Sequence, residues 1–197
     1  MFKAKMILEM QGYWAVGSGK GGGTEVDSRI DRDSDGLPYV PGKMLKGLIK
    51  DACFRLHSAG NKKYDFVDEI FGKTLVTEGL NRTSTEPGKI FISDARLPVN
   101  LRVALSKEEN LSARDNITRN IYATAIDENG TAKNKSLRGY EVAVPMKLVA
   151  DFESDCNKET FDCIKDACKL VYALGAHKTR GLGEVKISFT DVIEAKI

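Results

Sequence analysis

The order of apolar periods along the chain constrains its fold more than any other feature. Alternate apolar residues predict strands, and apolar residues three to four positions apart predict helices. The predicted elements are strand 2–13, helix 43–58, strand 89–97, strand 141–152, a helix capped by Asn157 and ended by Gly175, and strand 184–193. Two strand–helix–strand halves in this order predict an α+β, ferredoxin-like (RRM-like) βαββαβ sheet with both helices on one face.

One stretch does not fit this alternation of strands and helices. Residues 98–140 lack a strong apolar period and are rich in Asn, Arg and Lys. We therefore interpret residues 1–197 as a single domain that carries an insertion at about 98–140. A projecting hairpin is the expected form of this insertion.

Two glycine-rich basic segments lie far apart in the chain. Residues 17–23 read GSGKGGG and residues 175–183 read GAHKTRGLG. Glycine lets the backbone approach a ligand closely, and N–H groups flanked by Lys and Arg suit phosphate oxygens. Two such loops fit a long polyanion better than one bound nucleotide, so they predict nucleic-acid binding. The predicted strands carry no aromatic pattern for stacking bases, so recognition of the nucleic-acid backbone is expected.

The composition bears on the location of the protein and on the partners it can bind. The formal net charge is only +2, so a basic surface must come from the placement of charges. No apolar run approaches 18 residues and the N-terminus has no leader pattern, which predicts that membranes are not a partner. The cysteines contain no C-x-x-C pair, which predicts reduced thiols in a cytoplasmic protein and no metal site. They are Cys53, Cys156, Cys163 and Cys168.

The segment that joins the first glycine loop to the first predicted helix carries a specific motif. Residues 36–47 read GLPYVPGKMLKG. This resembles the G-hydrophobe-P-Y-hydrophobe-P-G-x-x-L-K-G signature of the RAMP superfamily of CRISPR effector proteins. The glycine-rich segment 175–183 is similar to the second hallmark of the superfamily. The order of elements agrees as well, so the resemblance covers nearly the whole chain.

The resemblance implies a role in antiviral defence. A chain of this length is similar to the type III backbone subunits. Several copies of such a subunit line up along a guide RNA, beside other effector subunits, and the guide pairs with a complementary target RNA. The insertion would then form a thumb hairpin that kinks the guide–target duplex.

The resemblance also implies phosphate-binding roles for basic residues. Lys43, Lys46 and Lys50 follow the predicted helix start, where side-chain charge and helix dipole both favour phosphate. A solvated lysine face is the alternative interpretation, and His177 could either stack on a base or cap its loop. The residues expected to bind RNA are Gly17, Ser18, Gly19, Lys20, Lys43, Lys46, Lys50, Arg119, Arg138, His177, Lys178 and Arg180.

An acidic stretch follows the first glycine segment. In the type III backbone subunits, the loop before the signature carries an aspartate that cuts target RNA, and Asp27 is the best match here. A carboxylate at this position could orient a 2′-hydroxyl for in-line attack or hold a divalent cation, Mg²⁺ or Mn²⁺. The other acids of the stretch are expected to pair with neighbouring arginines instead. These acids are Asp31, Asp33 and Asp35, with Arg29 and Arg32 as partners.

Three alternatives stay open from the sequence. A non-catalytic subunit would hold the guide RNA or cap its 5′ end, and Arg29 stands where the family commonly has a proline. A guide-processing endonuclease of the same superfamily would need a His or Tyr base, for which His57, His177 and Tyr13 are candidates. A small-nucleotide-binding domain would need a P-loop, and residues 17–20 lack its full spacing.

Overall fold

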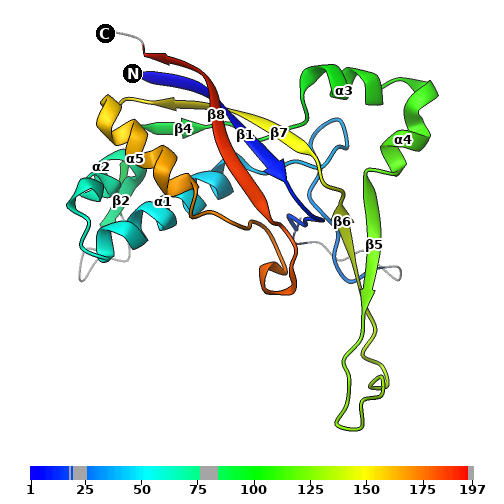
Figure 1. Ribbon diagram of the computed structural model, residues 1–197. Coiled ribbons are helices and arrows are strands. Elements are labelled where there is room, and N and C mark those ends of the chain that lie inside the picture. The colour runs from blue at the N-terminus through cyan, green and yellow to red at the C-terminus, as the bar shows by residue number, and fades with distance from the viewer. Residues whose placement is uncertain (18, 20–25, 76–83, 195–197) are drawn as a thin grey trace.

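The computed structural model describes residues 1–17, 19, 26–75 and 84–194. The protein has a mixed α/β architecture with antiparallel sheets (Figure 1). The main sheet has the spatial order β4-β7-β1-β8, and every neighbouring pair is antiparallel. Its strands are β1 (Phe2–Met10), β4 (Ile90–Ile92), β7 (Lys147–Ser154) and β8 (Val185–Glu194).

Two helices cover one face of the main sheet (Figure 1). They are α1 (Gly42–Ser58) and α5 (Lys158–Cys168). Alternate residues of β1 point toward them, so Met6 and Leu8 are fully buried while Lys5 is exposed. Phe161 of α5 stacks on Phe2 at 4.8 Å between ring centroids. The helices therefore cover the apolar face that the sequence pattern predicts for this strand.

Both long helices agree with their predicted starts. α1 begins at Gly42, one residue before the predicted start, and ends at Ser58 as predicted. The Asn157 side chain caps α5 by accepting a hydrogen bond of 2.8 Å from the Thr160 N–H. The prediction is wrong at the other end, since α5 stops at Cys168 rather than near Gly175. The residues that follow pair with the start of β8 instead, where the Val185 N–H donates to the Tyr172 carbonyl at 2.9 Å.

Three predicted strands are shorter or divided. The strand predicted over 2–13 is β1 and ends at Met10. The predicted strand 141–152 is two strands, β6 (Arg138–Ala143) and β7, because Pro145 between them has no N–H for a ladder. The predicted strand 89–97 keeps ladder pairing only in β4. The chain meets β7 again at Arg96, which forms an isolated antiparallel bridge with Val149. Between these two pairings, the Asp94 carboxylate accepts a hydrogen bond of 3.0 Å from the Gly42 N–H.

Short elements fill the connection between α1 and β4, which the sequence pattern did not resolve. They are η1 (Lys62–Tyr64), α2 (Val67–Phe71), β2 (Gly72–Leu75) and β3 (Ser84–Pro87), with β2 and β3 forming an antiparallel pair. Tyr64, Val67, Ile70 and Phe71 are buried in the core. This unit therefore extends the helical layer beside α1.

The region around 98–140 holds two short helices and a hairpin. Its elements are α3 (Val99–Leu105), η2 (Glu108–Asn110), α4 (Leu111–Asp115) and β5 (Thr118–Ala123), and β5 pairs with β6. Figure 1 shows the hairpin and its terminal loop projecting away from the main sheet. At the tip, the Asp127 carboxylate accepts hydrogen bonds of 2.9 Å from the Asn129 and Thr131 N–H groups.

The segment between β1 and α1 ties the hairpin to the main sheet. Trp14 is fully buried, its backbone N–H donates to the Ala143 carbonyl at 3.1 Å, and its indole N–H donates to the Val144 carbonyl at 3.0 Å. Ser28 forms a parallel bridge with Tyr140 of β6. Among the residues described, no helix is long and apolar enough to cross a membrane.

Candidate nucleic-acid interface

A cavity of about 570 Å³ lies between the β5–β6 hairpin, the segment after β1 and the turn η3 (Lys178–Arg180). We call it the central cavity. It brings together four of the residues predicted from the sequence, namely Asp27, Arg138, His177 and Arg180. Tyr140, Ser28, Thr124 and Ser136 also line it. These side chains come from three separate parts of the chain, so only the folded protein assembles them.

Asp27 is held in place by the hairpin. Its backbone N–H donates to the Gly139 carbonyl at 2.7 Å, and the Gly139 N–H donates to its Oδ2 at 2.8 Å. The residue is exposed, and within the described residues no hydrogen bond reaches its Oδ1. The carboxylate therefore has one oxygen held by the backbone of the hairpin and a second oxygen that accepts no hydrogen bond from any described residue.

The other acids of this stretch are engaged elsewhere. Asp31 accepts a hydrogen bond of 3.0 Å from the Tyr39 hydroxyl. Burial, together with this hydrogen bond, raises the Tyr39 pKa. Asp33 accepts from the Leu37 N–H, and Asp35 forms an ion pair with Arg102 of α3. Arg102 was not anticipated as a partner, because it is distant in sequence from the acidic stretch.

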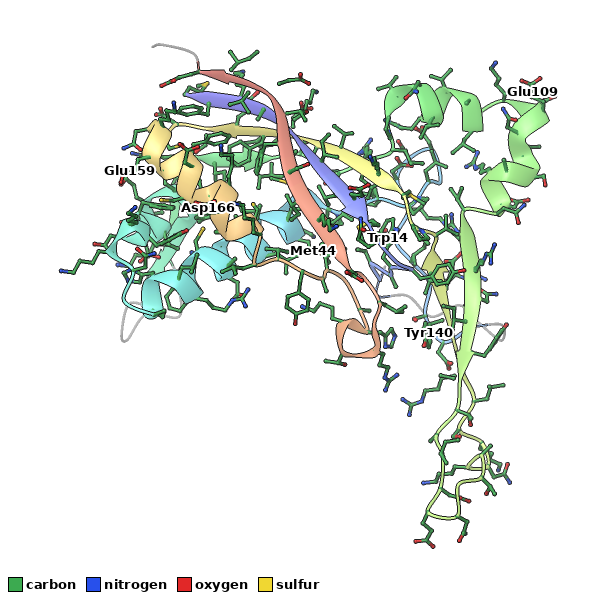
Figure 2. The ribbon with its side chains drawn as sticks, in the orientation of Figure 1. Trp14, Met44, Glu109, Tyr140, Glu159 and Asp166 are labelled. Carbon is green, nitrogen blue, oxygen red and sulfur yellow. The ribbon has the colours of Figure 1, made fainter. Side chains whose placement is uncertain are left out.

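His177 packs against the hairpin. It adopts a left-handed backbone conformation with φ of +57° at the start of η3. Its ring stacks on Tyr140 at 4.5 Å between centroids. Figure 2 labels Tyr140 at the hairpin. Sequence reasoning did not single out Tyr140, although it lies two positions after Arg138, and alternate residues of a strand share a face. That spacing is the signal that could have found it.

The second glycine-rich segment, 175–183, packs against residues 13–16, which lie just before the first glycine-rich segment. The Ala176 N–H donates to the Ala15 carbonyl at 2.7 Å, and the Gly183 N–H donates to the Tyr13 carbonyl at 2.8 Å. Gly175 has φ of +81°, and a Cβ there would collide with the Ala15 carbonyl. Glycine is thus needed at position 175 for the close packing of this segment against Ala15. Gly17 bridges to Ile30, whereas Ser18 and Lys20 lie outside the described residues.

The basic side chains around the central cavity have few partners. Arg138, Lys178 and Arg180 are exposed, and none has a carboxylate within 4.0 Å among the residues that the structure describes. Arg119 of β5 donates a hydrogen bond of 3.3 Å to the Tyr13 hydroxyl. These guanidinium and ammonium groups are available to an anionic ligand.

The three lysines of α1 differ from one another. Lys46 donates to the Ile90 carbonyl at 3.2 Å, and Lys50 donates to the Gly72 carbonyl at 2.5 Å. Burial, with the nearby Lys50 charge, lowers the Lys46 pKa. Lys43 is exposed and lines a separate hollow of about 720 Å³ with Asp94 and Arg96. Because Asp94 already accepts from the Gly42 N–H, a phosphate at this helix start would compete with a carboxylate.

A divalent cation would find one protein ligand in the central cavity. Asp27 is the sole carboxylate among its described lining residues, and no group of three or more His, Cys, Asp or Glu that could hold a metal occurs in the described parts of the chain. Mg²⁺ commonly binds one or two carboxylates together with phosphate oxygens and water. Asp27 and an RNA phosphate could therefore hold it jointly.

The four cysteines are free thiols, and burial raises the Cys53 pKa to about 12.

Comparisons with known proteins give a family and a fold. The sequence model of the RAMP superfamily matches residues 8–186. A solved chain from a "Cryo-EM structure of the Type III-B Cmr-beta bound to cognate target RNA" is similar, with a TM-score of 0.67, 16% identity, and coverage of 96% of this chain and 97% of that chain. A chain from the apo state of Type III-B Cmr-beta is similar with a TM-score of 0.63, 17% identity, and coverage of 96% and 98%. Comparison with curated proteins finds no match.

Proposed function

Because the chain belongs to the RAMP superfamily, we propose that it is a guide-RNA-binding backbone subunit of a type III CRISPR effector complex. Its partners are the guide RNA, a complementary target RNA, other effector subunits and further copies of itself. The type III-B complexes in which similar chains were solved support this proposal. The observation that carries it is the gathering of Asp27, Arg138, His177 and Arg180 around one cavity.

The finer description of the fold belongs to the same proposal. The strand order β4-β7-β1-β8, with α1 and α5 on one face, supports a ferredoxin-like assignment for the main sheet. The β5–β6 hairpin projects from it in the place expected for the thumb. The RNA then lies between the hairpin and η3, where Arg138 and Arg180 bind its phosphates.

The central cavity also suits cutting of the target RNA. The Oδ1 atom of Asp27, to which no described residue donates a hydrogen bond, accepts the proton of a 2′-hydroxyl and orients its oxygen for in-line attack. The 2′-oxygen bonds to the adjacent phosphorus while the bond from phosphorus to the 5′-oxygen breaks. The products are a 2′,3′-cyclic phosphate and a 5′-hydroxyl, whose proton comes from water. A divalent cation held by Asp27 and the RNA phosphate would stabilise the developing negative charge.

A non-catalytic subunit is the second candidate. The observation that favours it is the hydrogen bond from the Gly139 N–H to Asp27, which gives this carboxylate a structural task of its own. In that case Asp27 fastens the segment after β1 to the hairpin, and the subunit holds the guide RNA without cutting.

One experiment separates these functions. The tagged protein is purified from its native host, and the RNA that copurifies is sequenced. Uniform guides derived from repeats are expected, and recovery of no RNA or of unrelated RNA would contradict the proposal. The same material is then tested under single-turnover conditions. Cutting of a guide-paired target supports the catalytic subunit, cutting of repeat RNA indicates a guide-processing enzyme, and no cutting indicates a binding subunit.

A further inference from the structure

Tyr172 is a large aromatic residue that the fold holds in solvent. Its side chain is 71% exposed, while Val171 and Leu174 on either side of it are buried. Its backbone is fixed because the Val185 N–H donates to the Tyr172 carbonyl at 2.9 Å and the Leu174 N–H donates to the Gly183 carbonyl at 2.9 Å. The ring therefore faces solvent, and the backbone that carries it is already held by hydrogen bonds before any ligand binds.

The ring borders a small groove between α1 and the segment after α5. The groove has a volume of about 130 Å³, and the residues that matter to its chemistry are Asp51, Arg55, Leu170, Tyr172 and Lys178. Asp51 and Arg55 form an ion pair of 3.1 Å and so offset each other's charge. Lys178 has no carboxylate within 4.0 Å among the described residues, so the groove combines one uncompensated cation with one exposed ring.

The groove and the central cavity share a border. His177 and Arg180 line the central cavity, whereas Lys178 between them lines the groove. The turn η3 is therefore a ridge with a hollow on each side. An RNA strand whose phosphates contact Arg180 and which crosses this ridge meets Lys178 and Tyr172 next.

We propose that this groove is a stacking site for one base of the RNA strand bound at the central cavity. The Tyr172 ring stacks on the base and Lys178 binds the adjacent phosphate. This inference rests on the proposed RNA-binding function and adds a subsite to it. A protein surface is the less favourable occupant, because the uncompensated Lys178 and the shared ridge both match a continuing polyanion.

The first test measures the affinity of the full chain for short single-stranded RNA by fluorescence anisotropy. Y172A is expected to weaken binding by about 5- to 100-fold, whereas Y172F, which keeps the ring, stays within about twofold of wild type. F54A is the matched control, because Phe54 is 54% exposed on α1 and lines neither the groove nor the central cavity. Circular dichroism checks that each variant is folded.

The second test reports stacking directly. Y172W places an indole at the groove, and the one natural tryptophan, Trp14, is fully buried, so a response to RNA comes mainly from the new ring. RNA is expected to quench this fluorescence, and an oligonucleotide with abasic positions is expected to quench it less. Equal quenching by both would overturn the stacking proposal.

The outcomes separate this inference from the proposed function. If wild type and Y172A bind RNA equally, the stacking site is overturned and RNA binding stands. If Y172A leaves RNA affinity unchanged but alters association between copies in sedimentation without RNA, the groove is a protein contact. If wild type binds no RNA, the proposed function fails and the stacking site fails with it.

Discussion

One face of the main sheet is not covered by α1 and α5 (Figure 1), and we call it the open face. Both this face and the surface around the central cavity carry basic side chains, but among the described residues only those of the open face are paired with carboxylates. On the open face, Lys3 pairs with Glu153 at 3.0 Å, and Lys5 pairs with Asp151 at 2.5 Å. Lys147 and Glu9 form a third pair at 3.3 Å. Each pair is directly opposite in the register of β1 and β7. Around the central cavity, Arg138 and Arg180 have no such partners among the described residues.

This contrast explains how a chain of net charge +2 can offer a basic surface. Strand register brings lysines and acids face to face on the sheet, so their fields largely offset each other. The hairpin and η3 place Arg138 and Arg180 where no carboxylate of the described residues comes within 4.0 Å of them. Binding of a polyanion depends on the position of unpaired cations, and the net charge of the chain does not reveal it.

The largest expected effect comes from D27N. The amide oxygen of asparagine can still accept from the Gly139 N–H, but it cannot take a proton from a 2′-hydroxyl. Single-turnover cutting of a guide-paired target is expected to fall by about two to four orders of magnitude, with RNA affinity unchanged. D151N is the matched control on the open face and should cut at the wild-type rate. Wild-type cutting by D27N would place the reacting group elsewhere.

The next effect tests the unpaired arginines. Each phosphate contact to single-stranded RNA contributes about 0.7 to the slope of log affinity against log salt, so the double variant R138A/R180A should lose about 1.4 units of slope. The double variant K3A/K5A removes the same formal charge from the open face and should keep the slope. Equal losses in both variants would show that net charge, rather than position, controls binding.

A smaller effect concerns the packing of Gly175 against Ala15. G175A forces a positive φ on alanine and a collision with the Ala15 carbonyl, so unfolding free energy should fall by at least about 1–3 kcal/mol. G47A is the matched control, because Gly47 lies inside α1 with open space at its Cβ position. That variant should gain about 0.5–1 kcal/mol. Urea unfolding measures both, and a neutral G175A would contradict the packing argument.

The smallest effect belongs to the open face itself. A double-mutant cycle on Lys5 and Asp151 should give a coupling energy of about 0.2–1 kcal/mol, because both side chains are about half exposed. The coupling should shrink as salt is added. A larger, salt-independent value would mean that this face is shielded from solvent by another molecule.

Much of the main sheet could be predicted from sequence because its signals are local. The alternation in β1, the apolar spacing of α1 and the Asn157 cap each act within one element. The break at Pro145 was also visible in the sequence, but the valines around it favoured one continuous strand. The small unit that follows α1 has elements of only three to five residues, too short for a clear period.

The candidate site was predictable as residues and not as an arrangement. Asp27, Arg138 and His177 were identified singly, and only tertiary pairing with Gly139 and Tyr140 joins them. For Lys46 and Lys50, the structure differs from what their sequence spacing predicts. Their spacing indicates a solvated or phosphate-binding face, yet carbonyls at Ile90 and Gly72 accept hydrogen bonds from them. Nothing in the spacing of α1 reports what packs beside it.

The attachment of Asp27 to Gly139 has a mechanical consequence. Gly139 belongs to the strand that runs to the tip of the hairpin, and the base of that strand is fastened at Trp14. The hairpin is thus anchored at its base by the buried Trp14 indole, and Asp27 is attached to it nearer the tip. A displacement of the tip carries Asp27 along with it.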